Sequence, residues 1–130
     1  MNTKSLALLA VLALCGCGGS GGVATPNPFA GTWAGPLDAS TGVNETVSFT
    51  VATNGNLSGT DAPVGGGTAG SDVGTVDTSG NFSVTATVTG SPSAHSTGVM
   101  SINGSGLLIG NGTTTQGSQQ AIFTFSLTKQ

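Results

Sequence analysis

Apolar side chains recur at every second position in three stretches of this chain. The stretches cover residues 43–51, 82–88 and 121–127, and threonine or serine fills most of the intervening positions. A period of two places successive side chains on opposite faces of an extended strand, so each stretch predicts a β-strand with one buried and one solvated face. Threonine suits the solvated face because its β-branched side chain favours the extended backbone.

Turn-forming residues lie between these stretches. The dipeptides Asn54-Gly55 and Asn103-Gly104 favour two-residue hairpin turns, since both residue types tolerate positive φ. Residues 77–80 predict a longer turn that contains glycine, and Pro63 and Pro92 mark loops. The whole pattern predicts eight strands and no helix after the N-terminal segment, over residues 30–37, 43–52, 56–61, 70–76, 81–89, 95–102, 106–111 and 120–128.

Short connections between these strands favour an up-and-down meander. Two return strands also begin alike, with Gly55-Asn56-Leu57-Ser58 in one and Gly80-Asn81-Phe82-Ser83 in the other. An even number of strands can close into a barrel, which removes both exposed edges. Only 5% of the residues are charged, so few side chains could protect an open edge. We expect an all-β domain, a small antiparallel up-and-down β-barrel of about eight strands, with a β-sandwich as the alternative.

The composition excludes several function classes. Gly, Ser and Thr number 23, 15 and 20 of 130 residues, and Arg and Tyr are absent. So much glycine and serine is typical of low-complexity chains, but a net charge of only −3 and the regular apolar pattern favour a folded domain. Two lysines cannot form the basic face that nucleic acids require. One histidine and two cysteines cannot complete a four-ligand zinc site. We expect no nucleic acid partner, no metal and no cofactor.

The first 16 residues have the features of an export signal. Lys4 precedes nine apolar residues at positions 6–14, which is about half of the ~20 needed to span a bilayer. The following Leu14-Cys15-Gly16-Cys17 resembles the lipobox of bacterial lipoproteins, with Gly16 before the cleavage site. That resemblance implies cleavage before Cys17 and attachment of acyl chains to it. A plain secretory signal with two incidental cysteines is the alternative.

Several acyl chains on Cys17 would anchor the protein stably, whereas one chain binds a membrane only marginally. In the lipoprotein family an aspartate after the modified cysteine retains the protein in the inner membrane. Gly18 holds that position here, so the resemblance implies the outer membrane if the host has two membranes. We therefore expect a signal peptide at residues 1–16, a lipidated Cys17 and a flexible Gly/Ser/Pro tether at residues 17–28, and a β-barrel domain at residues 29–128.

The first expected strand opens with Gly31-Thr32-Trp33, and a later one contains Gly55-Asn56-Leu57-Ser58-Gly59-Thr60. These segments resemble the calycin barrels, which comprise lipocalins and the avidin-like proteins. The resemblance covers about residues 30–60 and implies the fold class. It implies no binding site, because avidin-type sites use several tryptophans and a tyrosine, and this chain has one Trp and no Tyr. In lipocalins a basic residue packs across the tryptophan. Lys129 is the only cation of this domain, and we do not expect it to take that place.

Three single residues are candidates for a specific role. Trp33 is expected to be a buried plug that packs against residues such as Phe49 and Phe125, and the alternative is a stacking platform for a sugar or flat ligand. Glu45 falls on an apolar position and is expected at the rim of the barrel. If it is buried instead, its pKa should rise and it becomes a site candidate. His95 is expected in a solvated loop.

Catalytic motifs are missing from the sequence. No serine stands in a Gly-x-Ser-x-Gly motif, and the carboxylates are expected to lie apart in separate turns, at Asp38, Glu45, Asp61, Asp72 and Asp77. We expect no enzyme. We expect a lipid-anchored protein with a non-catalytic role in the cell envelope, either structural or in contact with an envelope protein or glycan. The alternative is a barrel that binds a small ligand. An interior filled by side chains favours the first, and an apolar pocket of a few hundred Å³ favours the second.

Overall fold

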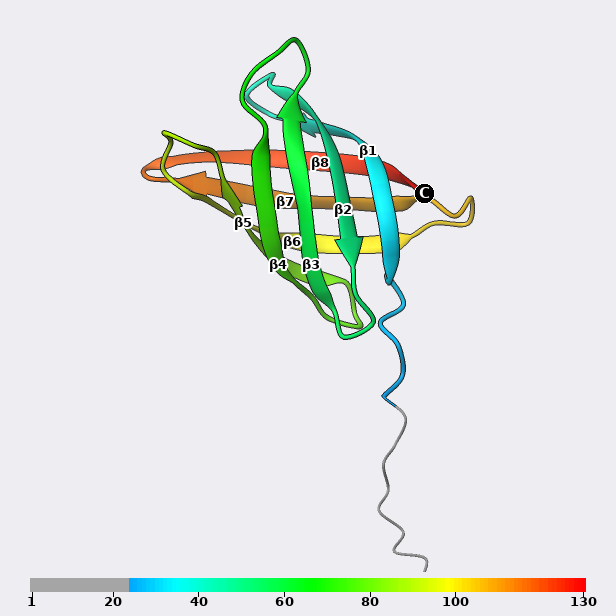
Figure 1. Cartoon of the computed structure of the whole chain (residues 1–130). Coiled ribbons are helices and arrows are strands. Elements are labelled where there is room, and N and C mark those ends of the chain that lie inside the picture. Colours follow the sequence, from blue (N-terminus) through cyan, green and yellow to red (C-terminus); the bar gives the residue numbers. More distant parts are fainter. Residues whose placement is uncertain (1–23) are drawn as a thin grey trace, which may run out of the picture.

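The structure, a computed structural model, describes residues 24–130 (Figure 1). These residues form eight strands and no helix, and hence no helix that could cross a membrane. The strands are β1 (Gly31–Ala39), β2 (Asn44–Val51), β3 (Asn56–Pro63), β4 (Gly70–Val76), β5 (Asn81–Thr87), β6 (Ala94–Ile102), β7 (Leu108–Gln116) and β8 (Gln119–Lys129). All eight expected strands are present.

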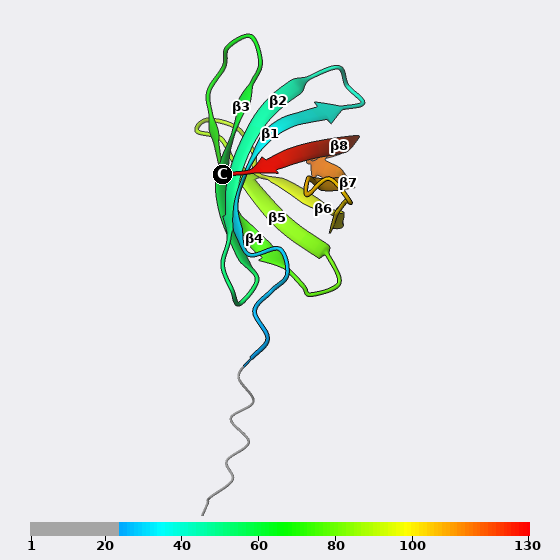
Figure 2. The same cartoon turned by 90° about the vertical axis from the view of Figure 1, so that its right-hand side faces the viewer.

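Each strand pairs antiparallel with its neighbour in sequence, and β8 pairs with β1 to close the barrel. Trp33 shows the closure directly, because it lies opposite Phe49 of β2 on one side and Lys129 of β8 on the other. The strands are steeply tilted, so that β6, β7 and β8 cross behind β1 to β4 (Figures 1 and 2). The expected closed up-and-down barrel is confirmed, and no strand edge of it is left open.

The three turns at one end of the barrel share a single design. Residues 52–55, 77–80 and 103–106 each place a glycine with positive φ at the fourth position, with φ values of 88°, 92° and 78°. In each, the fourth N–H donates to the carbonyl of the first residue, as in Gly55 N to Ala52 O at 2.9 Å. This hydrogen bond and the positive φ at the fourth position are typical of a type I turn followed by a left-handed glycine. The expected two-residue turns at Asn54-Gly55 and Asn103-Gly104 are therefore wrong, and in the second the glycine with positive φ is Gly106.

Strand β7 is longer than its sequence indicates. It was expected to end at residue 111 but runs to Gln116, where Thr113 to Thr115 pair with β6 and β8. The Gly-Asn-Gly segment at residues 110–112 resembles a turn, but its glycines serve packing. A Cβ added to Gly112 would lie 2.5 Å from the Thr97 carbonyl oxygen and 2.7 Å from the Phe123 ring, so the missing side chain leaves room for both.

The hydrophobic core fills the end of the barrel that carries these three turns, and we call it the closed end. Trp33, Val51, Leu108 and Leu127 are fully buried there. Asn27, which belongs to the stretch expected as a tether, is also buried at this end. Its Nδ2 donates to Val76 O at 2.9 Å and its Oδ1 accepts from the N–H of Phe29 at 2.9 Å. The chain that precedes β1 therefore packs across the closed end and seals it.

Trp33 is the centre of this seal. Only 1% of its surface is exposed, and its indole Nε1–H donates to Phe29 O at 2.8 Å. The ammonium of Lys129 lies 5.4 Å from the ring centroid, in range of a cation–π interaction. The expected burial is confirmed and Phe49 is the partner on β2. Phe125 lies instead opposite Leu37, nearer the other end. The expectation that no basic residue packs across the tryptophan is therefore wrong, because Lys129 does so.

Candidate functional site

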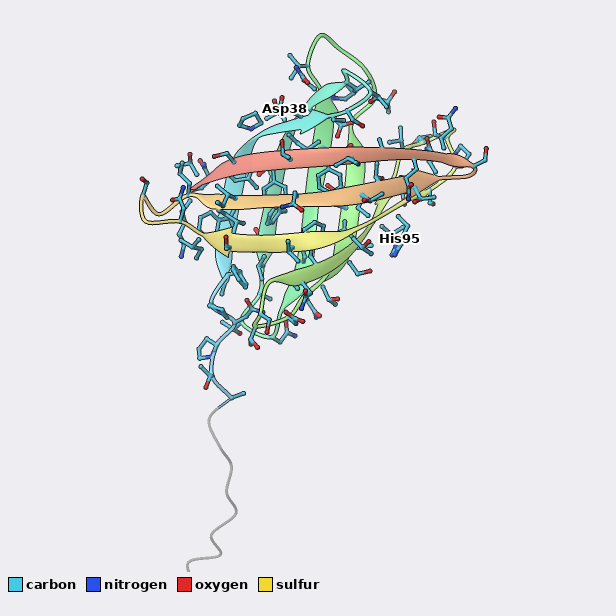
Figure 3. The ribbon with its side chains drawn as sticks, turned by 180° about the vertical axis from the view of Figure 1, so that it is seen from behind. Asp38 and His95 are labelled. Carbon is cyan, nitrogen blue, oxygen red and sulfur yellow. The ribbon has the colours of Figure 1, made fainter. Side chains whose placement is uncertain are left out.

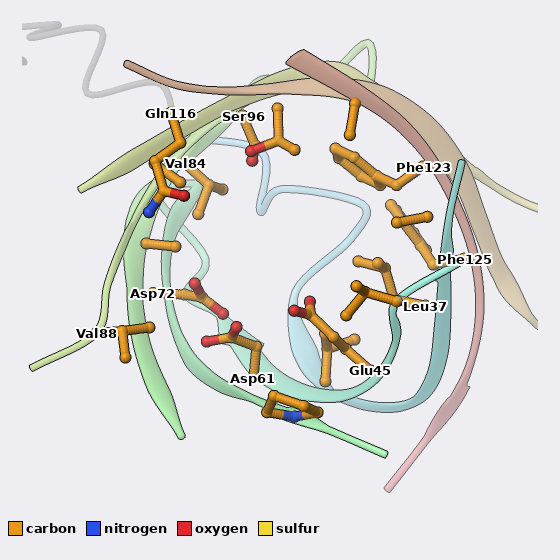
Figure 4. A pocket seen from close by; sticks show the side chains of 18 of the residues that line it. Leu37, Glu45, Asp61, Asp72, Val84, Val88, Ser96, Gln116, Phe123 and Phe125 are labelled. Carbon is orange, nitrogen blue, oxygen red and sulfur yellow. The ribbon is translucent and has the colours of Figure 1, made fainter. Parts of the chain in front are cut away.

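The half of the barrel beyond the core encloses a cavity of about 570 Å³ (Figure 4). Side chains of all eight strands line it, and at its outer end it is bordered by residues of the loops β1–β2, β3–β4 and β5–β6, such as Thr41, Thr68 and Ser91. The volume lies within the usual range of ~300–1,000 Å³ for small-molecule sites. The barrel therefore has a packed closed end and a hollow end, which we call the mouth.

One wall of the cavity is aromatic. Phe82 of β5 and Phe123 and Phe125 of β8 form a cluster in which the ring centroids lie 6.1 to 6.4 Å apart. Leu37 and Val84 extend this surface along β1 and β5. Such rings offer a broad apolar surface at a small loss of side-chain entropy.

Another wall is acidic. Glu45 of β2, Asp61 of β3 and Asp72 of β4 line the cavity, and Figure 4 shows their carboxylates converging from adjacent strands. The register explains this placement. Glu45 pairs with Pro63, two residues beyond Asp61, and Asp72 pairs with Gly59, two residues before it. Diagonal neighbours on one face of a sheet lie about 7–8 Å apart at their Cα atoms, within reach of one another's side chains.

Burial and mutual repulsion raise the pKa values of Glu45 and Asp72. Burial raises the pKa of Asp72 from 3.8 to about 6, and the charges of Asp61 and Glu45 add to the effect. Burial also raises the pKa of Glu45, with a contribution from Asp61. Asp61 Oδ1 is buried and accepts no hydrogen bond. No Lys, Arg or His is among the residues that line the cavity, so nothing in its walls neutralises the three carboxylates.

The structure corrects the expected scatter of carboxylates. Only Asp77 lies in a turn, where its Oδ1 accepts from the N–H groups of Ser79 and Asn81 at 2.8 and 2.9 Å. Hydrogen bonds from Asn81 are the main reason that the pKa of Asp77 is lowered. Asp38 lies on the outer face of β1, and the other three acids gather in the cavity. Glu45 is both the second residue of β2, as expected for a rim position, and a half-buried acid with a raised pKa.

His95 does not join the acidic wall. It lies within β6 rather than in a loop, where it pairs with Thr85 and Thr115, so the expected loop position is wrong. Its side chain is exposed on the outside of the barrel, as is that of Asp38 (Figure 3). Among residues 24–130, no histidine or lysine therefore lies beside the carboxylates of the cavity.

A simple signal would have located the acidic wall. Counting in steps of two from Leu57 reaches Asp61, and counting back from Val76 reaches Asp72, so both acids share the inward phase of their strands. Within residues 24–130, no three His, Cys, Asp or Glu side chains are placed to hold a metal ion. Cys17, the expected site of lipid attachment, lies outside the described residues.

Comparisons with known proteins identify no relative, so the function is argued from the geometry of the cavity. The chain matches no protein-family model, no curated protein and no solved structure. The closed barrel of eight antiparallel strands is consistent with a calycin-like fold.

Proposed function

We propose that the protein binds a small ligand in the mouth of a calycin-like barrel that a lipid anchor holds at the bacterial cell envelope. The observation that carries this proposal is the cavity of about 570 Å³. Protein interiors normally pack as densely as organic crystals and contain few voids larger than a water molecule. At ~30 Å³ for each water, this cavity corresponds to about 19 waters. In a domain of this size, so large an unfilled interior favours a binding role over a purely structural one.

The closed end supports the same function, because it holds the cavity in shape without a ligand. Trp33, Leu108 and Leu127 form a rigid floor, and the continuous ring of strands fixes the walls. A preformed site loses little conformational entropy when a ligand enters. In this proposal the barrel binds and releases its ligand without catalysis.

A neutral dye whose emission rises in apolar surroundings tests the proposal. We would titrate phenylnaphthylamine into the full chain carrying Cys17→Ser, so that no acyl chain competes for the cavity. Emission should rise and saturate. Ala86→Phe, which adds a ring inside the cavity, should abolish the rise, and Thr87→Phe, on the outer face of the same strand, should leave it intact. Equal binding by both variants would place the dye elsewhere and refute the proposal.

The anchor part of the proposal rests on Leu14-Cys15-Gly16-Cys17. Residues 24–30 leave the barrel at the closed end (Figure 2), so an anchor at Cys17 would direct the mouth away from the membrane. Cys17→Ser should release the protein from membranes, whereas Cys15→Ser should not. An unmodified Cys17 at the mature N-terminus, detected by mass spectrometry, would refute lipid attachment. In a host with two membranes we propose the outer membrane.

A second candidate is the non-catalytic binding of an envelope protein or glycan to the outside of the barrel. The observation that favours it is a pair of exposed aliphatic side chains, Val99 of β6 and Ile109 of β7, which are 48% and 36% exposed on neighbouring strands. A crosslinked adduct that forms in intact envelopes and is lost when both residues become serine would favour this function.

A further inference from the structure

The charged side chains that line the cavity are all negative. Every titratable side chain that lines it is a carboxylate, contributed by Glu45, Asp61 and Asp72 from three adjacent strands. The other charged or titratable groups of the barrel face elsewhere. Lys129 lies over Trp33 at the closed end, and His95 and Asp38 are on the outer surface. A ligand that enters the mouth therefore meets negative charge with no counter-charge from the protein.

Asp72 and the phenyl rings of β8 lie on opposite sides of the barrel, whereas Glu45 on β2 and Phe82 on β5 lie between them. β4, which carries Asp72, and β8, which carries Phe123 and Phe125, are separated by three strands in either direction around the ring. Figure 4 shows Asp61 and Asp72 across this space from Phe123 and Phe125, with Glu45 beside Leu37. A ligand that satisfies both walls needs a charged group at one end and an apolar body at the other.

The acidic wall also lacks hydrogen-bond donors. Asp61 Oδ1 is buried and has no partner, and a buried acceptor without a donor destabilises the empty site. An ammonium group supplies up to three N–H donors together with the missing positive charge. A carboxylate or phosphate ligand would add repulsion, and an alcohol would supply a donor without the charge.

On the basis of the proposed function, we propose that the ligand is an organic cation with an apolar body. Its ammonium group binds between Glu45, Asp61 and Asp72, and its apolar part packs on the phenyl rings of β5 and β8. The cavity volume limits the ligand to roughly the size of 15–20 water molecules. The acidic wall thereby selects for positive charge and the aromatic wall for an apolar group.

Proton binding should compete with this ligand. Because the pKa of Asp72 is about 6 in the empty site, a cation that requires the ionised form binds more weakly as the pH falls through that value. If this one carboxylate dominates, affinity at about pH 5 should be about tenfold below that at about pH 7.5. A neutral ligand of the same shape should show no such loss.

Three probes with one shared body test the selectivity by calorimetry on the full chain carrying Cys17→Ser. Phenylbutylamine, phenylbutanol and phenylbutyrate differ only in the terminal group. We expect the amine to bind about tenfold or more tightly than the alcohol, and the carboxylate to bind most weakly. Asp61→Asn or Glu45→Gln should reduce amine affinity toward that of the alcohol. Asp38→Asn removes a charge from the outer face and should change neither affinity.

The outcomes separate this inference from the function on which it rests. If the alcohol or the carboxylate binds as tightly as the amine, the cavity is a ligand site and the cation selectivity is wrong. If none of the three probes binds and the dye also fails, the ligand-binding function itself is wrong. Equal loss of amine and alcohol affinity in Asp61→Asn would indicate damage to the cavity. The test then rests on Glu45→Gln and on the pH dependence of amine binding by the wild-type sequence. If amine affinity changes neither in Glu45→Gln nor at low pH, the inference is wrong.

Discussion

Replacing Asp72 with asparagine should stabilise the empty barrel at neutral and alkaline pH. Asp72 is forced into a cavity wall beside two other carboxylates, and burial together with their charges raises its pKa from 3.8 to about 6. The folded protein therefore holds this proton more tightly than the unfolded chain. The barrel keeps its full stability below the unfolded pKa and loses part of it as the pH rises through the folded value.

The magnitude follows from the size of the pKa change. A rise from 3.8 to about 6 corresponds to about 3 kcal/mol at about 1.4 kcal/mol for each tenfold change in the proton-binding constant. Asp72 keeps partial contact with solvent, which screens the interaction, so we expect Asp72→Asn to stabilise the protein by about 1–2 kcal/mol above about pH 7. The asparagine amide can also donate a hydrogen bond to a neighbouring carboxylate, which acts in the same direction.

Urea unfolding followed by far-ultraviolet circular dichroism measures this effect. The free energy of unfolding of Asp72→Asn should exceed that of the wild-type sequence at about pH 8, and the gain should shrink toward zero at about pH 4. Asp38→Asn is the matched control, because it removes one carboxylate from the exposed outer face of β1 and should change stability little. A gain that is equal at both pH values, or a loss at about pH 8, would refute the electrostatic reasoning.

Three further predictions concern the closed end and the packing of the barrel. Trp33→Phe removes the hydrogen bond to Phe29 O and should cost about 2–4 kcal/mol by urea unfolding; efficient acrylamide quenching of Trp33 in the folded wild type would contradict its burial. Asn27→Ala leaves Val76 O and the N–H of Phe29 without partners and should cost about 1–3 kcal/mol, with faster amide exchange at Phe29 as the specific sign. Gly112→Ala should cost about 1–3 kcal/mol because the added methyl group meets the Thr97 carbonyl oxygen and the Phe123 ring, and an unchanged unfolding midpoint would show that strand β6 and the ring both shift freely.

The sequence alone determined the strand content and the closed topology. The alternation around Val47 and Phe49, together with the spacing of turn residues, is local information, and local information is sufficient for an up-and-down barrel because every strand pairs with its neighbour in sequence. The same reasoning identified Trp33 as a buried plug. It failed at the end of β7, which was expected at residue 111. Gly110 and Gly112 are positions within this strand, and Phe125 and Phe123 pack on them from β8.

Only the tertiary structure decided that the barrel is hollow at one end and what its cavity contains. Glu45, Asp61 and Asp72 are 11 to 27 positions apart in sequence, and only the registers of β2, β3 and β4 bring them together. The pairing of Lys129 with Trp33 likewise depends on the contact between β8 and β1, which joins the two ends of the domain. Whether side chains fill an interior depends on the tilt of the strands and on the sum of volumes around the ring, and no local pattern reports either quantity.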